Sequence, residues 1–147
     1  MLDTSASAFL KKHGFNIETY YLKNTTIPLG ETVRYKAAEI TFSYDEPTKT
    51  LNIVRLSAIE QSKSLNSVFA SAIRFIEWLI NDFHEIQTIK TLISNNFSTL
   101  NKNISNDDHA NIYKKHLGAI SLGYDEMMGG EMLTLDTAEY RKRKANT

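Results

Sequence analysis

The sequence contains no cysteine, which excludes disulfide bonds, thiolate nucleophiles and cysteine-based metal sites. It also lacks net charge, because seventeen Lys and Arg residues balance seventeen Asp and Glu residues. A chain without excess positive charge exerts no long-range attraction on nucleic acid or on an anionic membrane. We therefore do not expect general binding to nucleic acid.

Long apolar runs are absent as well. No stretch approaches the ~18 consecutive apolar residues of a membrane-spanning helix. The first residues, MLDTSASAFLKKHG, lack the basic start and the apolar run of a signal peptide. We expect no membrane insertion, and we expect the protein to reside in the cytoplasm.

Glycine is scarce, with six in the chain, and none precedes the N-terminus of a predicted helix, so no phosphate-binding loop is visible. No serine lies in the Gly-x-Ser-x-Gly pattern of a hydrolase. The four histidines are scattered and show no metal-ligand spacing. We expect neither hydrolysis nor a metal site.

What is present is the composition of one globular core. The chain has 147 residues, of which 41% are hydrophobic and 23% charged. No repeat, linker or second composition regime appears, so we expect a single α+β domain over residues 1–140. A basic C-terminal tail, residues 141–147, is expected to follow and to be mobile. Its charged residues are Arg141, Lys142, Arg143 and Lys144.

The strongest helix signal covers Asn66–Phe83, where apolar residues recur at intervals of three and four. Ser64 or Asn66 is positioned to cap its start. We expect this amphipathic helix to be the centre of the core, with Phe69 and Ile76 as residues whose loss disrupts folding.

Two shorter helices are predicted. The first covers residues 4–13, capped by Ser5 or Thr4. The second follows Asp107 or Asp108 as its cap and stops at Gly118.

Alternating or β-branched segments predict the strands. Pro28 and Gly30 are expected to break the chain between the first two strands, because proline removes a backbone donor and glycine permits a turn. The order strand, helix, strand around the central helix predicts a parallel crossover pair. The predicted strands cover residues 17–22, 34–44, 50–59, 86–94, 119–124 and 132–136, with a turn at 45–49, a polar connection at 95–106 and a final hairpin around 127–130.

The run Tyr113-Lys114-Lys115-His116-Leu117-Gly118 resembles the closing motif of Gcn5-related acetyltransferase (GNAT) folds. The resemblance implies a GNAT-like mixed sheet. It also implies that, if acetyl-coenzyme A binds, Tyr113 serves as proton donor, Glu60 is a candidate base, and Ser62, Lys63, Ser64 and Asn66 hold the pyrophosphate. Residues 59–67 contain no glycine, however, and side chains at every position obstruct close backbone approach. We therefore expect no cofactor.

Four motifs in order resemble the LcrR family of type III secretion regulators. They are FLKKHGF at residues 9–15, IPLG at 27–30, LNSVFASA at 65–72 and IYKKHLGA at 112–119. The resemblance implies a bacterial regulator of secretion, a virulence function, with no active site to transfer and with secretion-system proteins as partners. Residues 95–106 and the basic tail match poorly.

Three other functions stay open: a type III secretion chaperone, an acetyltransferase that uses acetyl-coenzyme A, and a binding domain unrelated to secretion. Secretion chaperones are usually acidic homodimers, and the zero net charge counts against that class. The sequence leaves a homodimer open. We expect protein contacts through a sheet edge, through the flexible thioethers of Met127 and Met128, or through the basic tail.

Overall fold

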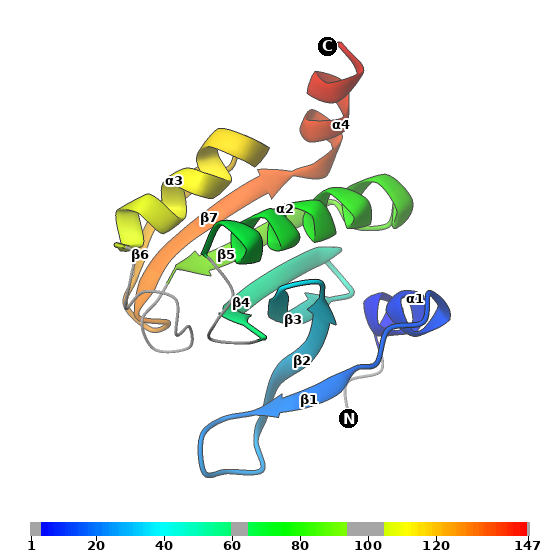
Figure 1. Cartoon of the computed structure of the whole chain (residues 1–147), viewed down its shortest axis with the longest axis vertical. Helices are drawn as coiled ribbons and strands as arrows, with labels where there is room; N and C mark the ends of the chain where they lie inside the picture. Colours follow the sequence, from blue (N-terminus) through cyan, green and yellow to red (C-terminus); the bar gives the residue numbers. More distant parts are fainter. Residues whose placement is uncertain (1–3, 60–64, 94–104, 147) are drawn as a thin grey trace.

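The computed structural model describes residues 4–59, 65–93 and 105–146, and its elements are drawn in Figure 1. The helices are α1 (Ser5–Lys12), α2 (Leu65–Asp82), α3 (Asn106–Leu117) and α4 (Thr137–Ala145). The strands are β1 (Glu18–Tyr21), β2 (Pro28–Tyr35), β3 (Ala38–Asp45), β4 (Thr50–Ala58), β5 (Thr88–Ile93), β6 (Ile120–Asp125) and β7 (Gly130–Asp136). The polar connection expected over 95–106 lies almost wholly outside the described residues.

The strands form one seven-stranded sheet in the order β1-β2-β3-β4-β5-β7-β6. Every neighbouring pair is antiparallel except β4 and β5, which are parallel and are joined through α2. The predicted crossover is thus confirmed, because a parallel pair requires a connection that returns along the sheet. The order also places β1 at one edge of the sheet and β6 at the other.

Helices α2 and α3 contact each other and cover one face of the sheet, with α2 over β2, β3 and β4 and α3 over β5 and β7 (Figure 1). Alternate strand residues such as Ile40, Ile53 and Leu133 are buried beneath them. Among the intervening residues, Glu39 and Asn52 are polar and only partly buried. One face of the sheet therefore builds the core, as alternation along a strand requires.

The central helix forms as predicted. Phe69 and Ile76 of α2 are buried in the core, together with residues from the strands. Trp78 is half-buried and packs against Phe9 of α1 with ring centroids 5.4 Å apart. Helix α1 is thereby attached beside α2, and its N-cap is Thr4, whose hydroxyl accepts from the amide of Ser7.

The break expected at Pro28 and Gly30 is wrong, because both residues belong to β2. Pro28 is the first residue of the strand, a position where a missing backbone donor is tolerated. Gly30 serves close approach rather than a turn, since a Cβ there would lie 2.5 Å from the carbonyl oxygen of Phe42.

The strand expected over 34–44 is also wrong as one element. The segment contains the end of β2 and most of β3, joined by a tight turn in which Lys36 adopts a positive φ of 53°. Side-chain alternation continues across the turn, so periodicity alone does not reveal it. The antiparallel pair β3–β4 that follows is confirmed.

Helix α3 begins at Asn106, slightly earlier in the chain than its acidic residues indicate. Its N-cap is Ser105, whose side chain accepts from the amide of Asp108, and not Asp107 or Asp108 themselves. Those carboxylates lie in the first turn, where the helix dipole favours negative charge. Gly118 ends the helix in the left-handed conformation, as predicted.

The mobile basic tail is a further error. Arg141, Lys142, Arg143 and Lys144 all lie in α4, which begins at Thr137 and is capped by Asp136.

Within the described ranges, no helix has both the length and the apolar character needed to span a bilayer.

Candidate functional site

The outermost strand, β6, carries an unusual concentration of exposed apolar side chains. Ile120 is 63% exposed, Leu122 56% and Tyr124 70%, and Met127 in the following turn is 96% exposed. Large apolar side chains at this exposure usually lie apart on a soluble protein. Here four of them occur within eight consecutive residues, at a sheet edge where β6 pairs with β7 and with no other described strand.

The pairing of β6 with β7 distributes these side chains over both faces. Ile120 pairs with Thr134, and Tyr124 pairs with Glu131. A bulge between Ser121 and Gly123 shifts the register, so apolar groups are presented on both sides of the strand. A partner strand or helix placed beside β6 would contact apolar surface whichever face it covers.

The turn after β6 is ordered by its own hydrogen bonds. The side chain of Asp125 accepts from the amide of Met128 at 3.1 Å, and the amide of Gly129 donates to the carbonyl of Asp125 at 2.8 Å. Met128 is half-buried while Met127 is directed outward. Of the two methionines predicted as contact residues, Met127 is thus the more accessible.

The residues of the basic segment are divided between two roles. Arg141 donates from Nη2 and Nε to the carbonyl of Ile80 near the end of α2, at 2.8 and 3.0 Å. Arg143 donates to the carbonyl of Leu117 at the end of α3, at 3.0 Å. The two arginines hold other helices, whereas Lys142 and Lys144 are exposed.

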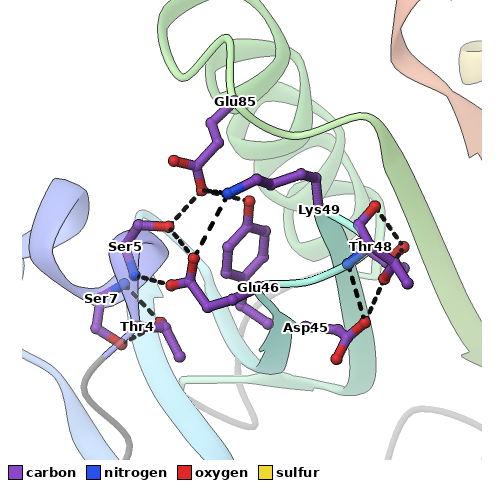
Figure 2. Close-up of polar contacts among 10 residues, drawn as sticks. Thr4, Ser5, Ser7, Asp45, Glu46, Thr48, Lys49 and Glu85 are labelled. Atoms are coloured by element: carbon purple, nitrogen blue, oxygen red, sulfur yellow. Dashed lines mark hydrogen bonds and ion pairs between the residues drawn. The ribbon is translucent and has the colours of Figure 1, made fainter.

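A polar cluster at the start of α1 ties that helix to the turn between β3 and β4 (Figure 2). The amide of Ser5 donates to Glu46, and its hydroxyl contacts the carboxylates of both Glu46 and Glu85. Lys49 lies between them, with Nζ 3.7 Å from Glu46 and 3.6 Å from Glu85. The hydroxyl of Tyr44 also donates to Glu85.

The pKa shifts in this polar cluster indicate a structural attachment of α1. Hydrogen bonds from Ser5 and Tyr44 lower the pKa of Glu85, and the charge of Lys49 lowers it further. Burial, together with the neighbouring Glu85, raises the pKa of Tyr44. Both groups are therefore fixed in the protonation states that suit their hydrogen bonds, which gives a stable attachment rather than a site poised for proton transfer.

The residues predicted to hold acetyl-coenzyme A are only partly described. Ser62, Lys63 and Ser64, with the candidate base Glu60, lie outside the described residues. Asn66 is exposed in the first turn of α2.

The strands around the predicted site part from each other. The parallel ladder between β4 and β5 ends at the pair Ile53–Thr91, while β4 continues to Ala58. The connection from β4 to α2, residues 59–64, contains no glycine. A glycine-free connection does not favour the close backbone approach that a pyrophosphate requires.

Tyr113, the predicted proton donor, is the bulkiest of the fully buried side chains in the described part of the chain. Burial raises its pKa. The ring of His109 lies 5.4 Å away, and burial lowers the pKa of that histidine to about 4. This environment is typical of a core tyrosine, and it does not favour donation of a proton to a bound thiolate.

Sequence reasoning missed the contribution of Ile120, Leu122 and Tyr124. Their pattern predicted a strand correctly, but exposure depends on the position of that strand in the sheet. The available signal was the run of large apolar residues on either side of Gly123, without the lysine or proline that protects many edge strands.

The fold is similar to those of solved GNAT acetyltransferase structures. A mutant of spermidine N-acetyltransferase SpeG from Vibrio cholerae matches with a TM-score of 0.50 at 8% identity, over 95% of this chain and 78% of that one. Ribosomal-protein-S5-alanine acetyltransferase from Vibrio fischeri matches with a TM-score of 0.49 at 12% identity, over 92% of this chain and 69% of that one. The N-terminal domain of ribosomal-protein-alanine acetyltransferase from Clostridium acetobutylicum matches with a TM-score of 0.46 at 10% identity, over 85% of this chain and 94% of that one. The expected GNAT-like α+β fold is confirmed, and identities this low concern the fold alone.

Sequence comparison adds the family. No curated protein matches the chain significantly. The family model described as "Type III secretion system regulator (LcrR)" matches residues 4–145, which is nearly the whole chain and includes β6, the polar cluster and α4. The protein therefore belongs to the LcrR family of type III secretion system regulators.

Proposed function

We propose that this protein regulates type III secretion in the bacterial cytoplasm by binding other proteins of the secretion system through β6 and the turn that follows it. The proposal rests on one observation, the exposure of Ile120, Leu122, Tyr124 and Met127 at the edge of the sheet. We call these four residues the β6 edge surface.

The β6 edge surface suits protein contact for two physical reasons. An edge strand has backbone donors and acceptors on its outer side, and these pair readily with an added strand. Burying each large apolar side chain contributes about 1.5–3 kcal/mol, so even a few of the four provide the free energy for a specific contact. Met127 adds a flexible side chain that adapts to its partner.

The regulator is proposed to act without acetyl-coenzyme A. Two features support this part of the proposal: the glycine-free connection after β4 and the enclosed position of Tyr113. A fold used by acetyltransferases does not by itself carry their activity, because function depends on the site. Protein contact requires only the exposed edge.

The test is a secretion assay in the bacterium from which the gene comes. Tyr124→Ser and Leu122→Ser would replace the chromosomal allele, and secreted substrates would be quantified in the culture supernatant. The matched control is Tyr21→Ser, which removes an exposed aromatic residue from β1 at the opposite edge. We expect the β6 variants to lose normal regulation and the control to retain it.

Thermal unfolding of the purified variants would establish that each is folded. Folded β6 variants that regulate secretion as the wild type does would contradict the proposal. A partner found to be a secreted effector whose export requires the protein would favour the chaperone alternative instead.

A further inference from the structure

Two hollows flank Arg74 on the outer face of α2. One, of about 310 Å³, lies between α2 and α3 and is lined by Phe69, Ile73 and Ile112, among others. The second, of about 530 Å³, lies between α2 and the turn joining β2 to β3. Arg74 borders both, as does Ala70. The two hollows thus share a border at Ala70 and Arg74 of α2, and we call the pair of them the Arg74 trough.

Small side chains of α2 border the Arg74 trough. Ser67 and Ala70 are exposed on α2, so another chain is able to approach the helix closely. Ser71 fixes the adjacent wall, since its hydroxyl donates to the carbonyl of Ser67 at 2.7 Å and accepts from the amide of Ala37 at 3.2 Å. The shape therefore does not depend on a loosely held loop.

Two of the three charged side chains that border the Arg74 trough in the described part of the chain are positive. Lys36 borders one hollow, and Arg74 borders both. Among the described residues, Arg74 takes part in no salt bridge and is exposed. Among the described residues of the lining, the acidic one is Glu77, whose carboxylate already accepts from the hydroxyl of Tyr140. Within the described lining, no carboxylate forms an ion pair with Arg74.

We propose that the Arg74 trough binds an acidic segment of a partner protein that also carries apolar side chains. Carboxylates of the segment would meet Arg74 and Lys36, which charge complementarity favours. An apolar side chain would enter the hollow between α2 and α3, where Phe69, Ile73 and Ile112 are half-buried or buried. These residues are distinct from the β6 edge surface, so the protein has a second contact site.

The experiment begins with a phage-displayed library of random 12-residue peptides selected on the full-length protein. Selected peptides would be synthesised with a fluorescein label, and their affinity would be measured by fluorescence anisotropy. We expect enrichment of Asp and Glu beside an apolar residue. We also expect Arg74→Glu to weaken binding by about tenfold or more, and Arg74→Lys to weaken it less.

Two controls test the location. Lys23→Glu makes the same charge change at an exposed residue between β1 and β2 and should leave the affinity unchanged. Tyr124→Ser should also leave it unchanged, so failure here and failure at the β6 edge surface are distinguishable. Raising the salt concentration should weaken binding to the wild type more than to Arg74→Glu, because salt screens exposed charges.

Four results would overturn the proposal. The first is selection without acidic enrichment, and the second is equal affinity for wild type and Arg74→Glu. The third is displacement of the peptides by micromolar coenzyme A, which indicates a phosphate-bearing ligand as the occupant. The fourth is self-association that depends on Arg74, which indicates a second copy of the chain.

Discussion

Arg143 donates a hydrogen bond from its guanidinium to the carbonyl oxygen of Leu117 at 3.0 Å, and so joins α4 to the end of α3. The carbonyls of the last helical turn have no partner within the helix, and a cation there also interacts favourably with the helix dipole. The basic segment at the C-terminus is therefore part of the packed structure.

Arg143→Ala should lower the free energy of unfolding by about 1–2 kcal/mol, because a charged hydrogen bond to the end of α3 is lost. Urea denaturation measures this change. Lys142→Ala, one residue earlier in the same helix, is the matched control and should change stability by less than about 0.5 kcal/mol. Equal effects of the two substitutions would contradict the capping role of Arg143.

Gly118→Ala should destabilise the protein for two coupled reasons. Residue 118 has a φ of +72°, which costs a residue with Cβ about 1 kcal/mol, and its Cβ would lie 1.8 Å from Nη1 of Arg143. The double variant Gly118→Ala with Arg143→Ala should lose less stability than the sum of the single variants. Additive losses in a double-mutant cycle would show that the steric contact has no energetic consequence.

Gly30→Ala should destabilise by about 2 kcal/mol or more, since the new Cβ would lie 2.5 Å from the backbone oxygen of Phe42 and neither strand moves freely. Gly123→Ala is a useful comparison, because nothing lies within 4 Å of a Cβ there and only its positive φ is unfavourable. Thermal unfolding should therefore rank Gly30→Ala as the more damaging substitution. The reverse order would contradict the close approach of β2 to β3.

The polar cluster predicts a pH dependence of stability. The pKa of Glu85 is lowered in the folded state by Ser5 and Tyr44. The ionised carboxylate thus contributes stability that is present above the unfolded pKa of about 4.3 and is lost as the pH falls through the lower folded pKa. Glu85→Gln should reduce the acid-side loss when the free energy of unfolding is measured from about pH 6 downward.

Glu126→Gln, which removes an exposed carboxylate from the turn between β6 and β7, is the control for the pH measurement. An acid-side profile that is the same for wild type and Glu85→Gln would show that the cluster contributes no linkage.

Acetyl-coenzyme A should give no heat of binding at millimolar concentration, because the glycine-free connection after β4 does not favour pyrophosphate binding. It should also give no thermal stabilisation, since only a ligand that binds the folded state raises its stability. Isothermal titration with Tyr113→Phe and Ser64→Glu beside the wild type measures this directly. Micromolar binding that both variants weaken would favour an acetyltransferase over a contact protein.

The sequence predicts those elements whose signal is local. The apolar repeat of α2 identifies the central helix, and the strand on either side of it predicts the parallel pair β4–β5. The positive φ needed to end α3 is marked by Gly118. These features depend on residues close together in the chain.

Features that depend on distant partners were missed. Pro28 and Gly30 enter β2 because β1 and β3 pair with it, which local turn chemistry does not indicate. The basic residues of α4 form a helix because Tyr140 is buried and Arg141 bonds to α2. Such tertiary contacts override a polar, low-hydrophobicity sequence.

The candidate surfaces show the same division. Met127 was predicted from its residue type, but the exposure of Ile120, Leu122 and Tyr124 follows from the outermost place of β6 in the sheet. The Arg74 trough combines α2 with α3 and with a turn some thirty residues earlier in the chain. Neither arrangement is visible until the strand order is known.

Site-specific photocrosslinking in secreting bacteria tests the central claim most directly. A photoreactive amino acid would replace Tyr124 at the β6 edge surface and, as the control, Tyr21 at the opposite edge, and adducts would be identified by mass spectrometry. The proposed function predicts an adduct between position 124 and a protein of the type III secretion system, with little or none from position 21. Folded protein that yields no adduct at 124, or yields the same adducts from both positions, would contradict a regulatory contact at β6.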